Sequence, residues 1–98
     1  MKHYIAHAYI NIDGDEVVFQ LYEESGSHVK LETYFSEASE KTVTICKRLE
    51  RYMEKRDFFL TVLRLDVKNL SNDDINQRTY KALEHLIQQE KSFLKFLT

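Results

Sequence analysis

Three acidic residues of the chain have the side-chain type and the expected positions to share a divalent cation. Asp13 ends the first expected strand, Glu40 lies near the start of an expected helix, and Asp66 lies late in an expected fourth strand. Carboxylates are the ligands that magnesium prefers, and paired ions can clamp both reacting oxygens of a phosphoryl transfer. However, Asp13 also suits a tight turn, and Glu40 suits the positive end of a helix dipole. We therefore expect structural roles, with a metal-dependent nuclease as the alternative.

The histidines and the single cysteine do not form a metal or catalytic motif. His3 and His7 lie about 13 Å apart along one strand, and His7 and His28 lie at least about 9.6 Å apart on different strands. Zinc bonds are near 2.0–2.3 Å, so neither pair can share an ion. Cys46 borders an apolar helix stripe, which indicates a buried, inert thiol. No phosphate-binding glycine loop or nucleophile motif appears, so we expect no cofactor and no metal.

Length and composition indicate one ordinary globular domain. The chain has 98 residues, of which 43% are hydrophobic and 31% are charged, and its formal net charge is -2. This charge excludes a globally basic nucleic-acid binder but not a local basic patch. There is no apolar run of about 18 residues and no signal-peptide pattern at the start. With one cysteine, these features favour a cytoplasmic protein without a membrane partner.

The elements that must position any site begin with three expected strands in the first 35 residues. Asp13-Gly14 is a strong signal for a two-residue turn, and it sets Ile10 opposite Val17 and Ala8 opposite Phe19. A three-residue loop at 24–26 then sets Leu21 opposite Val29. Both registers predict the same core face: Ala6, Ala8, Ile10, Val17, Phe19, Leu21, Val29, Leu31 and Phe35.

Two helices and a fourth strand complete the expected order. Helical spacing predicts a helix over 36–56 capped by Ser36, and alternation predicts a strand over 58–67. Ser71 and Asp74 have capping-box spacing, and Leu70 and Ile75 form a hydrophobic staple at the start of a helix that runs to the end. Some 26 residues give about 39 Å, against a domain diameter of about 33 Å, so this helix must cross the whole body or overhang it.

The fold class is therefore α+β, with the order β-β-β-α-β-α. It consists of an antiparallel three-stranded meander, a fourth strand after a crossover helix, and a long C-terminal helix. Parallel placement of the fourth strand beside the first gives the sheet order 3-2-1-4. That order resembles the first part of ribonuclease H-like folds and the truncated version in HicB-type antitoxins. The resemblance lies in element order alone, and no shared residue motif assigns a family.

The outward face of the meander is rich in aromatic residues for a solvated surface. Tyrosine and histidine suit contact surfaces, because their rings are apolar and their tips form hydrogen bonds. The tail adds Phe93 and Phe96, which diverge on a helix from Leu94 and Leu97 and so need a second surface. The expected partner-binding residues are Ile5, His7, Tyr9, Tyr22, His28, Tyr34, Phe93 and Phe96.

Positive charge gathers on one face of the first expected helix. Lys41, Arg48, Arg51 and Lys55 are spaced by seven, three and four residues, so they align. Four aligned cations suit phosphates or an acidic partner, but we favour a solvated face on which the Lys and Arg stems cover apolar neighbours.

Together these patterns favour a small non-enzymatic protein-binding module. An inhibitor, an antitoxin or immunity-type partner, or an accessory subunit all fit, in the cytoplasm of a microbe or its phage. The module would act by covering a protein surface, and we expect it to form a homodimer. The alternatives are the ribonuclease H-like nuclease using Asp13, Glu40 and Asp66, and nucleic-acid binding through the basic helix stripe.

Overall fold

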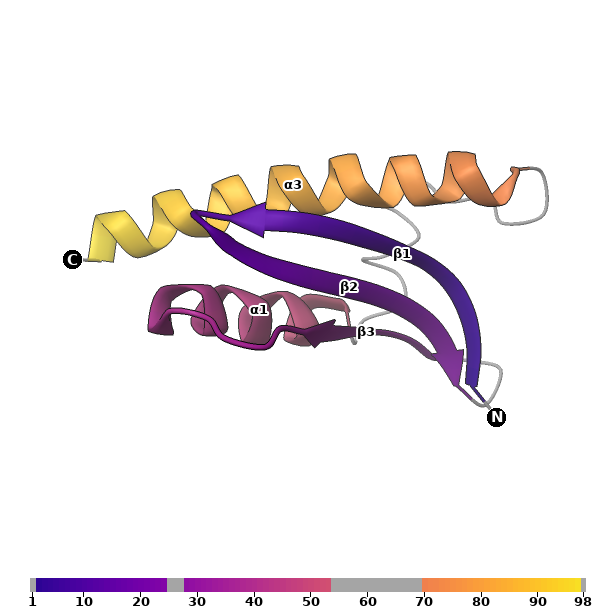
Figure 1. The fold of residues 1–98 in the computed structure, drawn as a ribbon, viewed down its shortest axis with the longest axis horizontal. Coiled ribbons are helices and arrows are strands. Elements are labelled where there is room, and N and C mark those ends of the chain that lie inside the picture. The colour runs from indigo at the N-terminus through magenta and orange to yellow at the C-terminus, as the bar shows by residue number, and fades with distance from the viewer. Residues whose placement is uncertain (1, 25–27, 54–69, 98) are drawn as a thin grey trace.

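The computed structural model describes residues 2–24, 28–53 and 70–97 of this chain. It is a small α+β domain, with β1 (Lys2–Ile12), β2 (Asp15–Glu24), β3 (His28–Tyr34), α1 (Glu40–Met53) and α3 (Asn72–Leu97). The strands form one antiparallel sheet in the order β1-β2-β3 (Figure 1). The expected fourth strand over 58–67 lies outside the described residues, as do Lys55 and Asp66.

The first hairpin has the turn and the register that the sequence predicts. Asp13 and Gly14 both have positive φ, at 51° and 95°, as a type I′ turn requires. The Gly14 N–H donates to Asn11 Oδ1 over 2.8 Å. Ile10 lies opposite Val17, which confirms the predicted pairing. The turn therefore fixes which side chains of β1 and β2 face the core.

The predicted register of the second hairpin is wrong by two residues. Leu21 lies opposite Leu31 rather than Val29, and Glu24 pairs with His28. This register sets two large apolar side chains opposite each other. Because the shift is even, Leu31 still faces the core. Phe35 was expected in the core but is 37% exposed, because β3 ends at Tyr34 and the alternation ends with it.

A β-bulge in β1 changes the faces of the first residues. Tyr4 lies opposite Tyr22 and Ala6 opposite Leu21, so Ile5 is an extra residue in β1. Tyr4 therefore shares a face with Tyr22, and their ring centroids are 6.2 Å apart. Ile5 is half-buried and packs against the core, which corrects the expectation that it points outward.

The first helix begins later than expected. Ser39, not Ser36, caps it, and its Oγ accepts the Thr42 N–H over 3.3 Å. The Ser39 N–H and hydroxyl also donate to Asp15 in β2, at 3.2 and 3.1 Å. A contact with the hairpin therefore selects the helix start, and this contact is not visible in local sequence.

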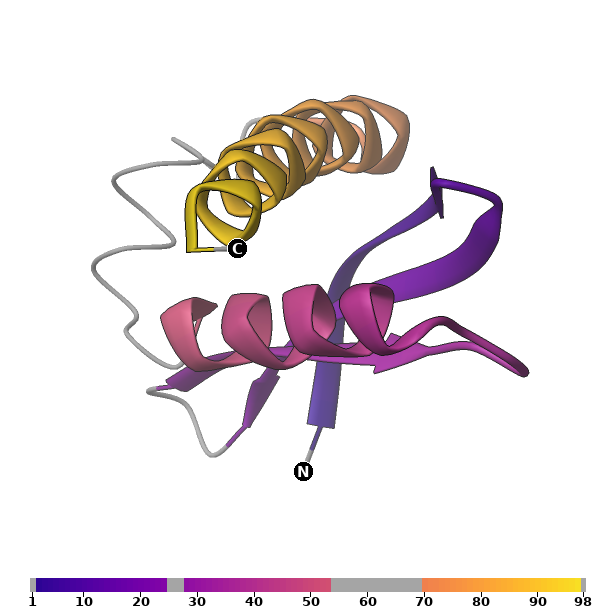
Figure 2. The same cartoon turned by 90° about the vertical axis from the view of Figure 1, so that its left-hand side faces the viewer.

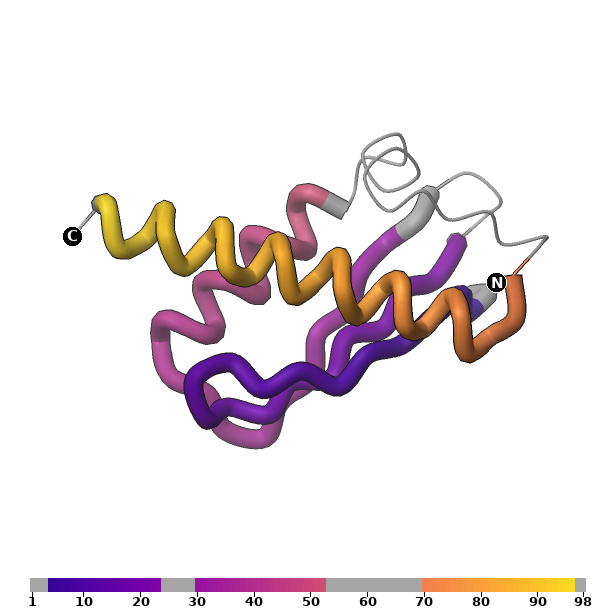
Figure 3. Tube along the Cα trace, turned by 90° about the horizontal axis from the view of Figure 1, so that it is seen from above, coloured from indigo at the N-terminus to yellow at the C-terminus, as the bar shows by residue number. Residues whose placement is uncertain are grey.

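The long C-terminal helix begins as predicted. Ser71 Oγ accepts the Asp74 N–H, as an N-cap side chain does, and the Ser71 hydroxyl donates to Asp74 Oδ2. At about 1.5 Å per residue, the 26 residues of α3 extend about 39 Å. The longest dimension of the molecule is 41 Å, so α3 runs its full length (Figures 1 and 3).

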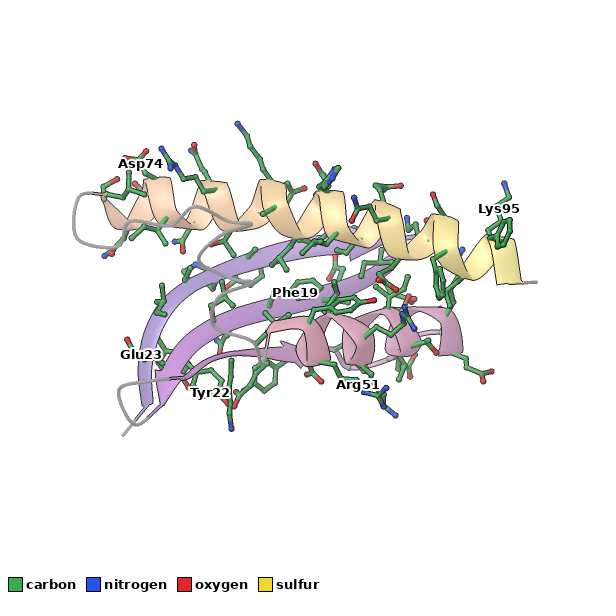
Figure 4. All side chains as sticks on the ribbon, turned by 180° about the vertical axis from the view of Figure 1, so that it is seen from behind. Phe19, Tyr22, Glu23, Arg51, Asp74 and Lys95 are labelled. Atoms are coloured by element: carbon green, nitrogen blue, oxygen red, sulfur yellow. The ribbon has the colours of Figure 1, made fainter. Side chains whose placement is uncertain are left out.

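Both helices lie on one side of the curved sheet (Figure 2). α3 packs mainly on β1 and α1 mainly on β3, and Phe19 lies fully buried between the sheet and the helices (Figure 4). In the part of the chain that is described, no helix has the length and apolar character needed to cross a bilayer. The core cluster consists of Ala6, Ala8, Ile10, Ile12, Val17, Phe19, Leu21, Leu31, Ile45, Cys46, Leu49, Ile75, Leu83, Leu86 and Ile87.

Thr79 places an unsatisfied hydroxyl in this interior. Its side chain is fully buried on α3, and its Oγ1 has no hydrogen-bond partner among residues 2–24, 28–53 and 70–97. Thr79→Val replaces the hydroxyl with a methyl group, so we expect the free energy of unfolding to rise by about 1 kcal/mol in urea denaturation. Thr44→Val is the control, because Thr44 is only half-buried and its hydroxyl donates to the Glu40 carbonyl. A less stable Thr79→Val protein would contradict this account of the interior.

Candidate functional site

The candidate site is the side of the sheet opposite the helices. Residues paired across three strands form two neighbouring rows there: Tyr9, Val18 and Tyr34, then His7, Gln20 and Glu32. We call this surface the open sheet face. Its described side chains are Tyr4, His7, Tyr9, Asn11, Glu16, Val18, Gln20, Tyr22, Lys30, Glu32 and Tyr34.

Three tyrosines dominate the exposed area of the open sheet face. Tyr4 is 59%, Tyr9 69% and Tyr34 47% exposed, and half-buried Val18 lies between the last two. The His7 ring meets the Tyr9 ring edge-on, with centroids 5.6 Å apart. The Tyr34 hydroxyl donates a hydrogen bond to Glu32. Neighbouring side chains therefore hold two of these rings in place while much of their area faces solvent.

The residues that were predicted for this surface differ in their exposure. His7, Tyr9 and Tyr34 lie on it and are exposed. Tyr22 shares the face but is only 5% exposed, so it does not present a contact surface, contrary to expectation. Tyr4 takes an exposed position that the sequence analysis missed, because the bulge at Ile5 was not foreseen. His28 lies in β3 opposite Glu24.

One end of the open sheet face meets the start of α3. The His7 N–H points away from β2 and donates to Asn76 Oδ1 over 3.0 Å. A hollow of about 270 Å³ lies beside this bond, lined by the bulge of β1 and the first turns of α3. Its lining residues are Tyr4, Ile5, Ala6, His7, Gln20, Asn72 and Asn76.

Among the predicted acidic residues, Asp13 lies beside two lysines and Glu40 lies at the start of α1. Asp13 Oδ1 lies 2.8 Å from Lys91 Nζ and its Oδ2 lies 3.8 Å from Lys41 Nζ. The hydrogen bond from Lys91 lowers the pKa of Asp13. Glu40 is exposed in the first turn of α1. Within residues 2–24, 28–53 and 70–97, no three His, Cys, Asp or Glu side chains are placed to hold a metal ion.

Asp15 is the second acid of the hairpin, and it joins β2 to the start of α1. The Thr42 hydroxyl donates to Asp15 Oδ2 over 2.5 Å, and Ser39 adds two further bonds. The bond from Thr42 is the main cause of a lowered pKa at Asp15, and the Ser39 backbone N–H adds to it. Asp13 and Asp15 together connect the β1–β2 hairpin to both helices.

The basic stripe on α1 is partly occupied inside the molecule. Arg48 Nε forms an ion pair with the buried Glu90, which raises the pKa of Arg48. Its Nη2 donates to the Tyr52 hydroxyl over 3.0 Å, and its guanidinium lies 4.6 Å from the centre of the Phe93 ring. Lys41 lies near Asp13, and Arg51 is exposed.

The end of α3 divides its apolar side chains as predicted. Leu94 packs against the core, whereas Phe93 is 43% and Phe96 is 87% exposed. Lys95 marks this end of the molecule in Figure 4. The Arg48 guanidinium lies over the Phe93 ring, whereas the Phe96 ring is nearly fully exposed.

Cys46 is a buried thiol, as predicted. It is 1% exposed on the core side of α1. Burial raises its pKa to about 11, and Thr33 partly opposes this with a hydrogen bond. A thiol with that pKa holds very little thiolate at neutral pH, which makes it a poor nucleophile.

Comparison with protein-family models, curated proteins and solved structures gave no match. The function is therefore inferred from the geometry of the site.

Acid should weaken the contact between Asp15 and α1. A carboxyl whose pKa falls below 3.8 on folding adds stability above that pH, and this stability is lost as the pH falls through the folded value. We therefore expect Asp15→Asn to be less stable than wild type near pH 6, with the difference shrinking toward about pH 2. Urea midpoints across this range measure it, with Glu84→Gln, an exposed change on α3, as control. A constant difference at every pH would contradict the role of the charge.

The Arg48–Glu90 pair should behave as a coupled unit. Removing Arg48 alone leaves the buried Glu90 carboxylate without its cation, and this is more costly than replacing both groups with apolar ones. We expect Arg48→Met to have a lower urea midpoint than the double variant Arg48→Met/Glu90→Leu. Equal losses for Arg48→Met and the exposed control Arg51→Met would show that the pair does not hold α3 against α1.

Proposed function

We propose that this protein is a small non-enzymatic binding module that acts by covering a surface of another protein. An inhibitor, an antitoxin or immunity-type partner, or an accessory subunit in the cytoplasm of a microbe or phage fits this role. The main support is the row of Tyr9, Val18 and Tyr34 on the side of the sheet that neither helix covers. Both tyrosines on this row keep about half or more of their area in solvent.

Exposed tyrosines contribute both apolar area and hydrogen bonds to an interface. Their large rings bury apolar area with few rotatable bonds, and their hydroxyls still form hydrogen bonds. Tyrosine is accordingly enriched among the residues that dominate binding free energy. The ladder of three paired strands fixes the spacing of the rings, so little ordering remains to be done on binding.

The two alternative functions have less support from the geometry. The Asp13 carboxylate lies beside two lysines, whose positive charges oppose the binding of a divalent cation there. Arg48 is bound to Glu90 and Lys41 is close to Asp13, so two members of the basic stripe already face carboxylates. These pairs favour structural roles over nuclease chemistry and over phosphate binding.

The exposed Phe96 supports self-association as a second feature of the proposal. It lies at the end of α3, on a different element from the tyrosine row. A homodimer through this end would leave the open sheet face for another protein.

A substitution on the tyrosine row tests the proposal. Tyr9→Glu places a charge on the tyrosine row, and Tyr80→Glu makes the same change at an exposed tyrosine of α3. The tagged wild type should capture a specific protein from its native cell extract, and Tyr9→Glu should reduce this capture at least about 10-fold. Tyr80→Glu should retain it, and both variants should unfold at the wild-type denaturant midpoint. Equal capture by both variants, or no specific capture by the wild type, would contradict the proposal.

A further inference from the structure

A second hollow opens on the open sheet face beside the Asp13-Gly14 turn. Tyr9 pairs with Val18 and Asn11 with Glu16, and these four side chains project on that side. Ile10 and Val17 also line the hollow, but their side chains are buried on the opposite side, so the space opens outward. Its volume of about 470 Å³ falls in the range of ligand-binding clefts.

Glu16 gives this hollow an uncompensated negative charge. It is exposed, and it makes no hydrogen bond or ion pair within the part of the chain that the structure describes. The other acids of this hairpin tip differ, since Asp13 faces Lys91 and Asp15 accepts three bonds from the start of α1. Residues 1–40, which include this hairpin, contain eight acidic and two basic residues, and the two lysines beside the turn, Lys41 and Lys91, face Asp13.

The other side chains of the hollow can contact both the charged head and the aliphatic stem of an arginine or lysine. Tyr9 is 69% exposed, and a tyrosine face attracts a guanidinium or ammonium within about 6 Å. Val18 is half-buried and offers an apolar surface for the aliphatic stem of such a residue. Asn11 is held by its bond from the Gly14 N–H, so the wall beside Glu16 is preformed.

We propose that this hollow receives an arginine or lysine side chain from an exposed segment of a partner protein. The inference rests on the proposed function and specifies the chemistry of the partner. The cation would lie between the Glu16 carboxylate and the Tyr9 ring, with its stem on Val18. Charge complementarity selects this occupant and disfavours nucleic acid and anionic lipid, whose phosphates Glu16 would repel.

A blocked peptide provides the probe. Acetyl-Gly-Arg-Gly-amide, added to the whole ¹⁵N-labelled protein, should shift the backbone amide signals of Tyr9, Glu16 and Val18 with a dissociation constant of the order of 1 mM. The matched peptide with citrulline, which keeps the shape but lacks the charge, should bind more weakly. Glu16→Gln and Tyr9→Leu should each weaken arginine-peptide binding by about 2- to 5-fold. Glu84→Gln and Tyr80→Leu, the same changes on exposed positions of α3, should leave it unchanged.

Three results of the peptide titration would overturn the inference, and a fourth result concerns self-association. The three are no shift up to about 10 mM arginine peptide, equal binding of the citrulline peptide, or shifts confined to the helices. If the wild-type protein self-associates and both Tyr9→Leu and Glu16→Gln are monomeric, a second copy of the chain occupies the hollow. That result also overturns the inference. The failure of this inference is distinct from the failure of the proposed function. If only this inference fails, Tyr9→Glu still reduces partner capture but the arginine peptide does not bind. If the proposed function fails, the arginine peptide binds but Tyr9→Glu does not change capture.

Discussion

The tight turn at Asp13-Gly14 is the constraint on which the rest of the structure depends. Its two positive φ angles fix the pairing of β1 with β2, and this pairing decides which side chains enter the core. The same hairpin carries the acids that hold both helices, since Asp13 binds Lys91 of α3 and Asp15 binds the start of α1. One turn therefore sets the register of β1 with β2 and the side of these strands on which the helices pack.

Both helices lie on one side of the sheet, and no other helix or strand among the described residues covers the opposite side. The small core uses the apolar half of each strand, and the opposite half carries tyrosines where solvated sheets usually carry charged residues. Glu16 adds a carboxylate without a partner in the described part of the chain, next to the exposed Tyr9. Rigid aromatic area beside an unpaired charge is the combination that favours recognition of another protein.

Local patterns in the sequence predicted the features that depend on neighbouring residues. The Asp13-Gly14 turn, the core alternation around it and the Ser71 cap of α3 follow from such patterns. Features that depend on distant contacts were missed. The bulge at Ile5 and the pairing of Arg48 with Glu90, 42 residues further along the chain, have no local signature. The residues of the open sheet face were predicted in outline, and the errors at Ile5 and Tyr22 come from the bulge and from burial.

Hydroxyl-radical footprinting of the protein in its native cell extract tests the central claim most directly. Purified protein and protein in the extract are labelled side by side, and the modification of each tyrosine is measured by mass spectrometry. The open sheet face as a binding surface predicts protection of Tyr9 and Tyr34 in the extract, with Tyr80 on α3 modified equally in both samples. Unchanged modification of Tyr9 and Tyr34, or protection confined to the helices, would contradict the account.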